Sequence, residues 1–225
     1  MTRKAWLKTF PKPQANKAVH ALQLAWSELA SNYKTDFNRE TREPRLTLVL
    51  ATYLRDVISI RLKLLGHWGA EDVKAKVDFS SGKIIEQIRT DIEYLWNDHT
   101  QNLCIVFEFK KLDQKNRSHK HYYGENGLLR FVTGDYSLKQ PLAFMAAVVL
   151  DDRHSCVTAL RQALQHASTS LCAICQNKGD FLHTPSNLFP GIADFDTEHA
   201  RDPAKAPPHG TIHVSHMFLE FGYPP

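Results

Sequence analysis

The chain has 225 residues, of which 43% are hydrophobic and 23% are charged, and its formal net charge at pH 7 is +4. These values are typical of an ordinary folded protein and exclude a collagen-like, disulfide-scaffold or strongly charged disordered chain. The length is most simply that of a single domain, residues 1–225, and the mild positive charge says only that an acidic partner is not repelled.

Three observations favour a cytoplasmic location. The N-terminal stretch from Met1 to Pro13 carries basic residues but lacks the apolar segment of a secretory signal. The longest apolar run, from Pro141 to Leu150, is too short to span a bilayer, so no membrane association is expected. The four cysteines follow no disulfide-scaffold spacing, which indicates a reducing compartment.

The first part of the chain, residues 1–70, is expected to be helical. Apolar residues recur at helical spacing from Asn16 to Asn32, which predicts one amphipathic helix. Pro44 suits the first turn of a second helix, from Arg45 to Leu65, which is apolar over more than one face and is expected to be largely buried. Gly66 is expected to end it.

The core, about residues 71–175, begins with segments that periodicity does not assign. Glu71 to Phe79 is ambiguous, and Lys83 to Ile88 is compatible with a strand or a short helix. Two strands follow, Asp91 to Trp96 and Leu103 to Phe109, joined by the polar turn Asn97 to Asn102. The second strand is apolar at six of its seven positions, as expected for a central strand buried on both faces.

Charged residues at the end of this second strand are the main anomaly of the sequence. Glu108 and Lys110 are two positions apart, so their side chains share a face about 7 Å apart. If the two strands form a simple hairpin with Trp96 opposite Leu103, then Asp91 lies directly opposite Glu108. Two carboxylates at that spacing repel unless a proton or a cation lies between them, and a hard divalent cation suits the gap. A slip of one residue would separate the acids.

Asp91 followed after sixteen residues by Glu108-Phe109-Lys110 resembles the D…(D/E)-x-K signature of the PD-(D/E)XK nuclease superfamily. Thr90, not proline, precedes Asp91, and the matching core covers about Lys83 to Leu150. The resemblance implies a restriction-endonuclease-like α/β fold: a central mixed sheet of about five strands, flanked by helices and preceded by N-terminal helices.

The same resemblance implies a function and a site. Asp91 and Glu108 would hold Mg²⁺, with Mn²⁺ as a substitute, and Lys110 would be the catalytic lysine. An additional acid on the first helix is common in the superfamily, and Glu28 or Glu86 is a candidate for it. The expected activity is metal-dependent hydrolysis of nucleic-acid phosphodiester bonds, with DNA a better substrate than RNA, as in bacterial restriction, repair or phage defence. Because the sequence shows no DNA-reading module, a partner protein or a homodimer is expected to supply specificity.

Basic residues follow the proposed site. Lys111, Lys115, Arg117 and Lys120, next to Tyr122 and Tyr123, suit contacts to phosphates and bases, although a solvated loop is an equal alternative. Arg130 is also a candidate phosphate ligand, or a partner of Asp135 or Glu125.

The remaining elements are a buried strand from Leu142 to Leu150 and a helix from Ser155 to Ala173. Asp151 and Asp152 between them are more typical of a turn or helix cap than of a metal site. Residues 176–210 carry five prolines and no periodicity, which predicts a long functional flap, a partner-binding loop or a disordered segment. Strand character returns from Thr211 to Phe221.

Two histidine and cysteine patterns are weaker metal candidates. Cys172 and Cys175 have the spacing of half a zinc site, which His183, His199 or His209 could complete, but cysteines beside a helix are often plain hydrophobes. His213 and His216 would face opposite sides of a strand and are not expected to bind one metal ion together. No Walker A, GxGxxG, GxSxG or HExxH motif occurs.

The alternative to a nuclease is a catalytically silent subunit of the same fold that uses residues 110–123 and 176–210 to bind nucleic acid or a partner protein. An intact set of Asp91, Glu108 and Lys110 favours the enzyme, because a degenerate nuclease usually loses one of them.

Overall fold

The computed structural model describes residues 6–70, 73–78, 80–167 and 182–223. Its centre is an open, mixed seven-stranded sheet with the order β1-β4-β5-β6-β9-β8-β7. The α/β class is therefore confirmed, with two more strands than the expected five. The bounds of the strands in this sheet are β1 His67–Ala70, β4 Ile92–Asn97, β5 Asn102–Leu112, β6 Leu142–Val149, β7 Leu182–His183, β8 Phe195–Ala200 and β9 Thr211–Leu219.

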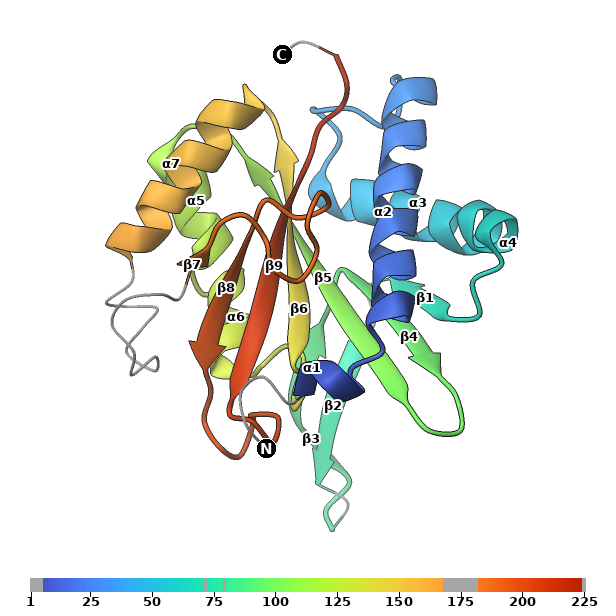
Figure 1. The fold of residues 1–225 in the computed structure, drawn as a ribbon, viewed down its shortest axis with the longest axis vertical. Helices are drawn as coiled ribbons and strands as arrows, with labels where there is room; N and C mark the ends of the chain where they lie inside the picture. Colours follow the sequence, from blue (N-terminus) through green and yellow to red (C-terminus); the bar gives the residue numbers. More distant parts are fainter. Residues whose placement is uncertain (1–5, 71–72, 79, 168–181, 224–225) are drawn as a thin grey trace.

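Helices cover the two faces of the sheet (Figure 1). Helices α2 (Lys12–Asn32) and α3 (Glu43–Tyr53) pack on one face, against alternate residues of β5 such as Phe107. On the opposite face α5 (Asn116–Tyr123), α6 (Leu128–Thr133) and α7 (Arg153–His166) pack on the intervening residues, such as Val106. The central strands are consequently buried on both faces, which explains their continuous apolar runs.

The pairing of β4 with β5 follows the predicted register. Trp96 lies opposite Leu103, and Ile92 lies opposite Phe107, with no shift between them. β5 is longer than expected and continues to Leu112, because its second half pairs in parallel with β6. Glu108 and Lys110 therefore lie within the strand and not at its end, which corrects that part of the prediction.

A separate two-stranded antiparallel sheet connects β1 to β4. It consists of β2 (Val73–Asp78) and β3 (Lys83–Arg89), with Val73 opposite Arg89. The ambiguous segment Lys83 to Ile88 is thus a strand.

The second N-terminal helix differs from the prediction. The helix that begins at Glu43 passes at Leu54 into a π-helical turn, η1 (Leu54–Ile58), and then into the short helix α4 (Ser59–Leu62). Lys63 ends it in a left-handed conformation, three residues before Gly66. The expectation that this helix is largely buried was wrong, because Leu48, Val57 and Ile60 are exposed on its outer side.

The C-terminal third also contains more regular structure than expected. Residues 176–210 do not form one long loop, because β7 and β8 lie within them and extend the sheet beyond β9. α7 begins at Arg153, with Asp152 as its N-cap, and ends at His166, before the expected Ala173, which lies outside the described residues. The first helix, α2, begins four residues before the predicted Asn16, and a single turn, α1 (Trp6–Thr9), precedes it.

Within the described part of the chain, no helix is both long enough and apolar enough to cross a bilayer.

Candidate active site

Asp91 and Glu108 meet at the point where β4 begins. Ile92 pairs with Phe107, so the next position in the same register places Asp91 opposite Glu108. The backbone N–H of Phe109 donates a hydrogen bond of 2.8 Å to Asp91 Oδ2, which fixes the aspartate beside β5. The sequence thus brings the two acids to one face of the sheet, as the hairpin register predicted.

Glu108 is the most constrained group of this cluster. Its side chain is 4% exposed, and its Oε1 accepts a hydrogen bond of 2.7 Å from Lys110 Nζ. The second oxygen, Oε2, is buried and has no hydrogen-bond partner among the described residues. A buried carboxylate oxygen without a partner has a desolvation cost of a few kcal/mol, so it marks a place where a proton, water or cation belongs.

Lys110 connects three acceptors. Besides Glu108, its ammonium donates to the backbone carbonyl of Phe109 at 2.7 Å and to Glu43 Oε1 at 3.2 Å. All three donor positions of the ammonium are therefore engaged. The side chain is 6% exposed, so the lysine is held rigidly beside the two carboxylates.

Glu43 is a member of the cluster that the sequence did not reveal. It is the first residue of α3, and its Oε2 also accepts a hydrogen bond of 3.0 Å from the backbone N–H of Lys111. An acid in the first turn of a helix is favoured by the helix dipole, and Glu43-Pro44 is a typical helix start. That local pattern indicates a helix N-terminus, but nothing in it indicates contact with a strand far along the chain.

The electrostatics of the cluster follow from burial and from the neighbouring acids. Burial is the largest effect on Glu108 and repulsion from Asp91 adds to it, while Lys110 partly offsets both; together they raise the pKa of Glu108 to about 8. Burial alone would lower the pKa of Lys110, but the negative charges of Glu108, Glu43 and Asp91 outweigh it and raise that pKa. The lysine is therefore charged and Glu108 is mostly protonated at neutral pH.

Tyr136 bounds the site on the side of α6. Its hydroxyl donates a hydrogen bond of 2.9 Å to the backbone carbonyl of Arg89, two residues before Asp91, and accepts one of 2.6 Å from Arg130. Burial and the charge of Glu108 raise the pKa of Tyr136, which shows that the ring lies near the carboxylates. Tyr136 therefore holds the chain that leads into Asp91.

Arg130 has a local structural role in the free protein. Its guanidinium contacts the carbonyl of Glu125, the side chain of Asn126 and the Tyr136 hydroxyl, and lies over the Tyr136 ring. It forms no salt bridge with the side chain of Glu125 or Asp135 within the described structure, so the expected ion-pair alternatives are not seen. Its role as a phosphate ligand stays a prediction.

The two acids suggested as additional ligands differ from Glu43. Glu28 bonds to Tyr53 at 2.8 Å and to Arg61 at 2.6 Å, on the other helices of the N-terminal region, and contributes nothing to the cluster. Glu86 lies in β3 opposite Lys76, and its side chain lies outside the described structure. The helix acid that the structure brings to the cluster is Glu43, and Glu28 lies outside it.

The basic residues after the site do not behave alike. Lys111 points back into the protein, where its ammonium donates to the carbonyl of Arg39 and burial lowers its pKa. Lys115 is largely exposed and lies 3.7 Å from Asp113. Arg117 and Lys120 are exposed on α5, so the expected solvated loop is a short helix with a basic outer side.

The competing metal candidates have other roles or lie outside the described residues. Asp152 caps α7 by accepting from Ser155 N at 2.8 Å, as the sequence favoured, and Asp151 accepts from Gln114 N. Cys172 and Cys175 are among the residues that the structure does not describe. Of the histidines, His199 and His216 are buried and share Thr197 Oγ1 at 2.9 Å each.

The donor set at Asp91 and Glu108 fits Mg²⁺. In the described ranges, no group of three or more His, Cys, Asp or Glu side chains is arranged to hold a metal ion. Mg²⁺ needs no such group, since it keeps several waters and is usually bound by one or two carboxylates together with substrate phosphates. Two opposed carboxylates, one with an unpartnered buried oxygen, supply that set.

Comparisons of the chain with protein-family models, with curated proteins and with solved structures found no match.

Proposed function

We propose that the chain is a cytoplasmic, Mg²⁺-dependent nuclease that hydrolyses phosphodiester bonds, with DNA as its better substrate. The observation that carries the proposal is the buried Glu108 oxygen without a partner, set opposite Asp91 and beside the charged Lys110. The preference for DNA, and a role in restriction or phage defence, rest on the resemblance of Asp91, Glu108 and Lys110 to the PD-(D/E)XK signature.

Each residue of the cluster has a distinct role in the proposed reaction. Asp91 and an ionised Glu108 would hold Mg²⁺, which when bound supplies an acidic water and a positive charge for the phosphate. Glu108 must first lose its proton, because burial raises its pKa to about 8. The Lys110 ammonium, held by Glu108 and Glu43, places a positive charge where the attacking oxygen and the phosphate become more negative.

Glu43 acts on this arrangement from α3. It contacts the Lys110 ammonium and the backbone of Lys111, so it fixes the lysine relative to the strand. Ground-state binding of nucleic acid is assigned to the exposed cations on and before α5, namely Lys115, Arg117 and Lys120. Lys111, a predicted contact, faces the protein and is expected to contribute least. Specificity is assigned to a partner protein or to a second copy of the chain.

The test is Mg²⁺- or Mn²⁺-dependent cleavage of DNA and RNA by the purified protein and by three variants, Asp91→Ala, Glu108→Ala and Lys110→Ala. Each variant is expected to lose at least about a hundredfold in rate, because these groups act on charge that develops in the transition state. Affinity for uncleaved DNA without metal should change little. The matched control is Glu28→Ala, which removes an acid outside the cluster.

Two outcomes would contradict the proposal. If the wild type cleaves neither DNA nor RNA with either metal but still binds them, the chain is the catalytically silent binding subunit. If cleavage survives Lys110→Ala unchanged, the nuclease stands but the role given to the lysine is wrong.

A further inference from the structure

A hollow lies on the same sheet as the candidate site, at the end of β4 and β5 that is farthest from Glu108. Its volume is about 420 Å³. The residues that line it come from the loop before β1, from β1, from both strands of the β4–β5 hairpin and from the turn before β6. They are Leu65, His67, Leu95, Trp96, Asn97, Asn102, Leu103, Cys104 and Gln140.

Part of the lining of this hollow shares one face of the sheet with the candidate site. Cys104 and Glu108 are four positions apart on β5, so both side chains point to the same face, about 13 Å apart along the strand. Leu95 lies opposite Cys104, as Asp91 lies opposite Glu108 in the continued register. A stacked nucleic-acid strand advances about 3.4 Å per nucleotide, so this separation spans about four nucleotides, or fewer in an extended strand.

The lining has the chemistry of a nucleobase site. None of its residues is an Asp, Glu, Lys or Arg, which disfavours a phosphate or an ionic ligand as the group that enters. Leu65 and Leu95 are 91% and 41% exposed and form apolar walls. Asn97, Asn102 and Gln140 add amide groups that can donate to and accept from the edge of a base. A neutral planar ring with a polar edge matches this set.

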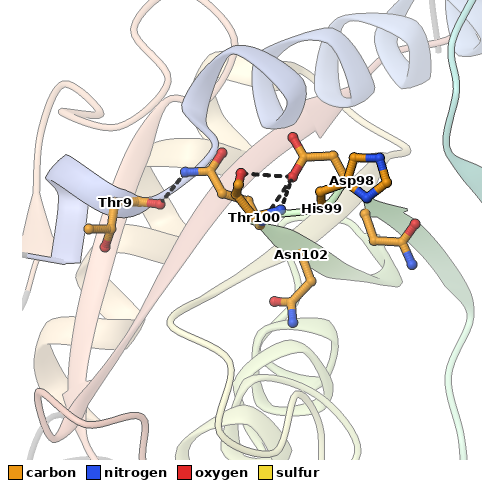
Figure 2. A pocket seen from close by; sticks show the side chains of 7 residues that line it. Thr9, Asp98, His99, Thr100 and Asn102 are labelled. Carbon is orange, nitrogen blue, oxygen red and sulfur yellow. Dashed lines mark hydrogen bonds between the residues drawn. The ribbon is translucent and has the colours of Figure 1, made fainter.

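The neighbouring hollow, on the other side of the same hairpin end, does not offer this chemistry. In this hollow the Asp98 carboxylate is bonded within the turn, to Thr100 (Figure 2), and the Gln101 side chain donates a hydrogen bond to the carbonyl of Thr9. Its lining is polar throughout and includes the carboxylate of Asp98.

A strained loop connects the candidate site to the hollow. Gly134, Ser137 and Lys139 all have left-handed backbone, with φ of 78°, 54° and 58°. Such conformations are costly for residues other than glycine and are retained where the surroundings hold them. Here the buried guanidinium of Arg201 donates to the carbonyls of Tyr136 and Ser137 at 2.9 and 2.7 Å.

The loop places different side chains at its two ends. Tyr136 points inward to the carbonyl of Arg89 beside Asp91, and Gln140 lines the hollow. Between them, Lys139 is exposed, and within the described structure its ammonium forms no ion pair. A free cation on the loop that runs from the candidate phosphodiester site to the neutral hollow is suited to a phosphate of a strand that occupies both.

We propose that the hollow between Leu65, Leu95 and Gln140 is a nucleobase subsite and that Lys139 contacts a phosphate between it and Asp91–Glu108. The substrate class is then single-stranded nucleic acid, or a strand with an unpaired base, because a base paired in a duplex cannot enter the hollow. This inference rests on the proposed nuclease function and names the substrate of the same site.

The test compares two strands of equal length without divalent metal, an oligothymidylate and a fully abasic strand with the same phosphates. The wild type is expected to bind the oligothymidylate about tenfold more tightly, which corresponds to about 1.4 kcal/mol. The double variant Leu95→Ala/Gln140→Ala should lose this preference. Leu48→Ala, which truncates an equally exposed leucine on α3, is the control and should keep it.

Lys139→Ala should weaken the binding of both strands alike and reduce the salt dependence of binding by about 0.7 in slope, as the loss of one phosphate contact requires.

Trp96 gives a readout that needs no variant. It is partly exposed and lines the hollow, whereas Trp6, Trp26 and Trp68 are buried. Oligothymidylate should therefore protect tryptophan fluorescence from acrylamide quenching, and the abasic strand should not.

The inference is overturned if the wild type binds both strands equally, or if the double variant, shown to be folded by its circular dichroism melting curve, keeps the preference. Cleavage by a protein that shows no base preference would contradict the subsite and leave the nuclease function intact. A base preference that depends on Leu95 and Gln140, in a protein that cleaves nothing with Mg²⁺ or Mn²⁺, would support the subsite and contradict the nuclease function.

Discussion

Two buried carboxylates of this protein, Asp196 and Glu108, have opposite environments. Asp196 in β8 is 1% exposed, and each of its oxygens accepts two hydrogen bonds. The donors are Ser186 Oγ and Ser215 Oγ at 2.8 and 2.7 Å, and the backbone N–H groups of Asn187 and Leu188 at 2.7 and 3.1 Å. Glu108 is 3% exposed but has one donor, Lys110, and one oxygen with none among the described residues.

The difference separates an acid whose hydrogen bonds are complete from one whose hydrogen bonds are not. Four donors stabilise the negative charge of Asp196 and tie the loop at 186–188 to β8 and β9. Glu108 has no such compensation, so its ionised form is disfavoured in the free protein. A buried acid that is left incompletely bonded, beside a second acid, is suited to accept a cation when one arrives.

The largest expected effect is on stability, in an isosteric pair of variants at pH 8 without metal. Asp196→Asn places an NH₂ group against donors and should lower the free energy of unfolding by about 3 kcal/mol or more, since a buried network is broken. Glu108→Gln removes an unfavourable charge and should leave stability unchanged or raise it. Urea denaturation measures both, and equal losses would remove the distinction between the two acids.

The pH dependence of stability sharpens the comparison. A glutamate in the unfolded chain ionises near its ordinary pKa of 4.5, whereas the pKa of folded Glu108 is about 8. Between these values the folded state binds more protons than the unfolded state, so the contribution of Glu108 to stability decreases as pH rises, by at most about 1.4 kcal/mol per pH unit. Thermal unfolding at several pH values should show this slope in the wild type and a smaller one in Glu108→Gln. The same slope in both proteins would show that a group other than Glu108 causes the pH dependence of stability.

Removal of the helix acid should have a smaller effect. Glu43→Gln keeps the hydrogen bond to Lys111 N–H but removes a negative charge beside Lys110. The ammonium is then less firmly held, and we expect cleavage to slow by about tenfold, in the range of one charge-assisted hydrogen bond. Glu40→Gln, at an exposed acid outside the cluster, is the control, and an equal effect of both changes would reduce the role of Glu43 to general electrostatics.

The smallest expected effect concerns the tyrosine that holds the chain before Asp91. Tyr136→Phe removes the hydrogen bond to the Arg89 carbonyl and should cost about 1 kcal/mol, seen as a decrease of about fivefold in kcat with KM nearly unchanged. Tyr53→Phe, which loses a bond to Glu28 outside the site, is the matched control. A change in KM alone would show that Tyr136 contacts substrate and does not position Asp91.

The parts of the site that the sequence predicted are those set by local geometry. Asp91 and Glu108 belong to one hairpin whose register follows from a polar turn and alternating side chains, so their opposition could be derived. Glu43 could not, since its contact with Lys110 depends on how α3 packs on a distant strand. A helical acid with no partner in its own segment is the only signal that the sequence offers.

The distinction between local geometry and contacts of distant segments also explains the errors in the predicted fold. β8 contains Asp196, Thr197, Glu198 and His199, which are typical of a loop, and it is a strand because polar partners from other segments satisfy these residues in the interior. The helices from Glu43 to Leu62 are apolar over more than one face, which predicted burial, but the protein leaves one side of them exposed. Apolar composition shows that a helix face can be buried. It does not show that another part of the chain packs against that face.

The measurement that tests the central claim most directly is Mg²⁺ binding by isothermal titration calorimetry at pH 7, repeated in two buffers that differ in ionisation enthalpy. If Asp91 and Glu108 hold the ion, Glu108 must give up its proton, because its pKa of about 8 leaves it mostly protonated at that pH. We predict the release of nearly one proton per bound Mg²⁺, a release that disappears well above pH 8, and loss of binding in Glu108→Gln. Binding that releases no proton, or that persists unchanged in Glu108→Gln, would contradict the assignment of this cluster as the metal site.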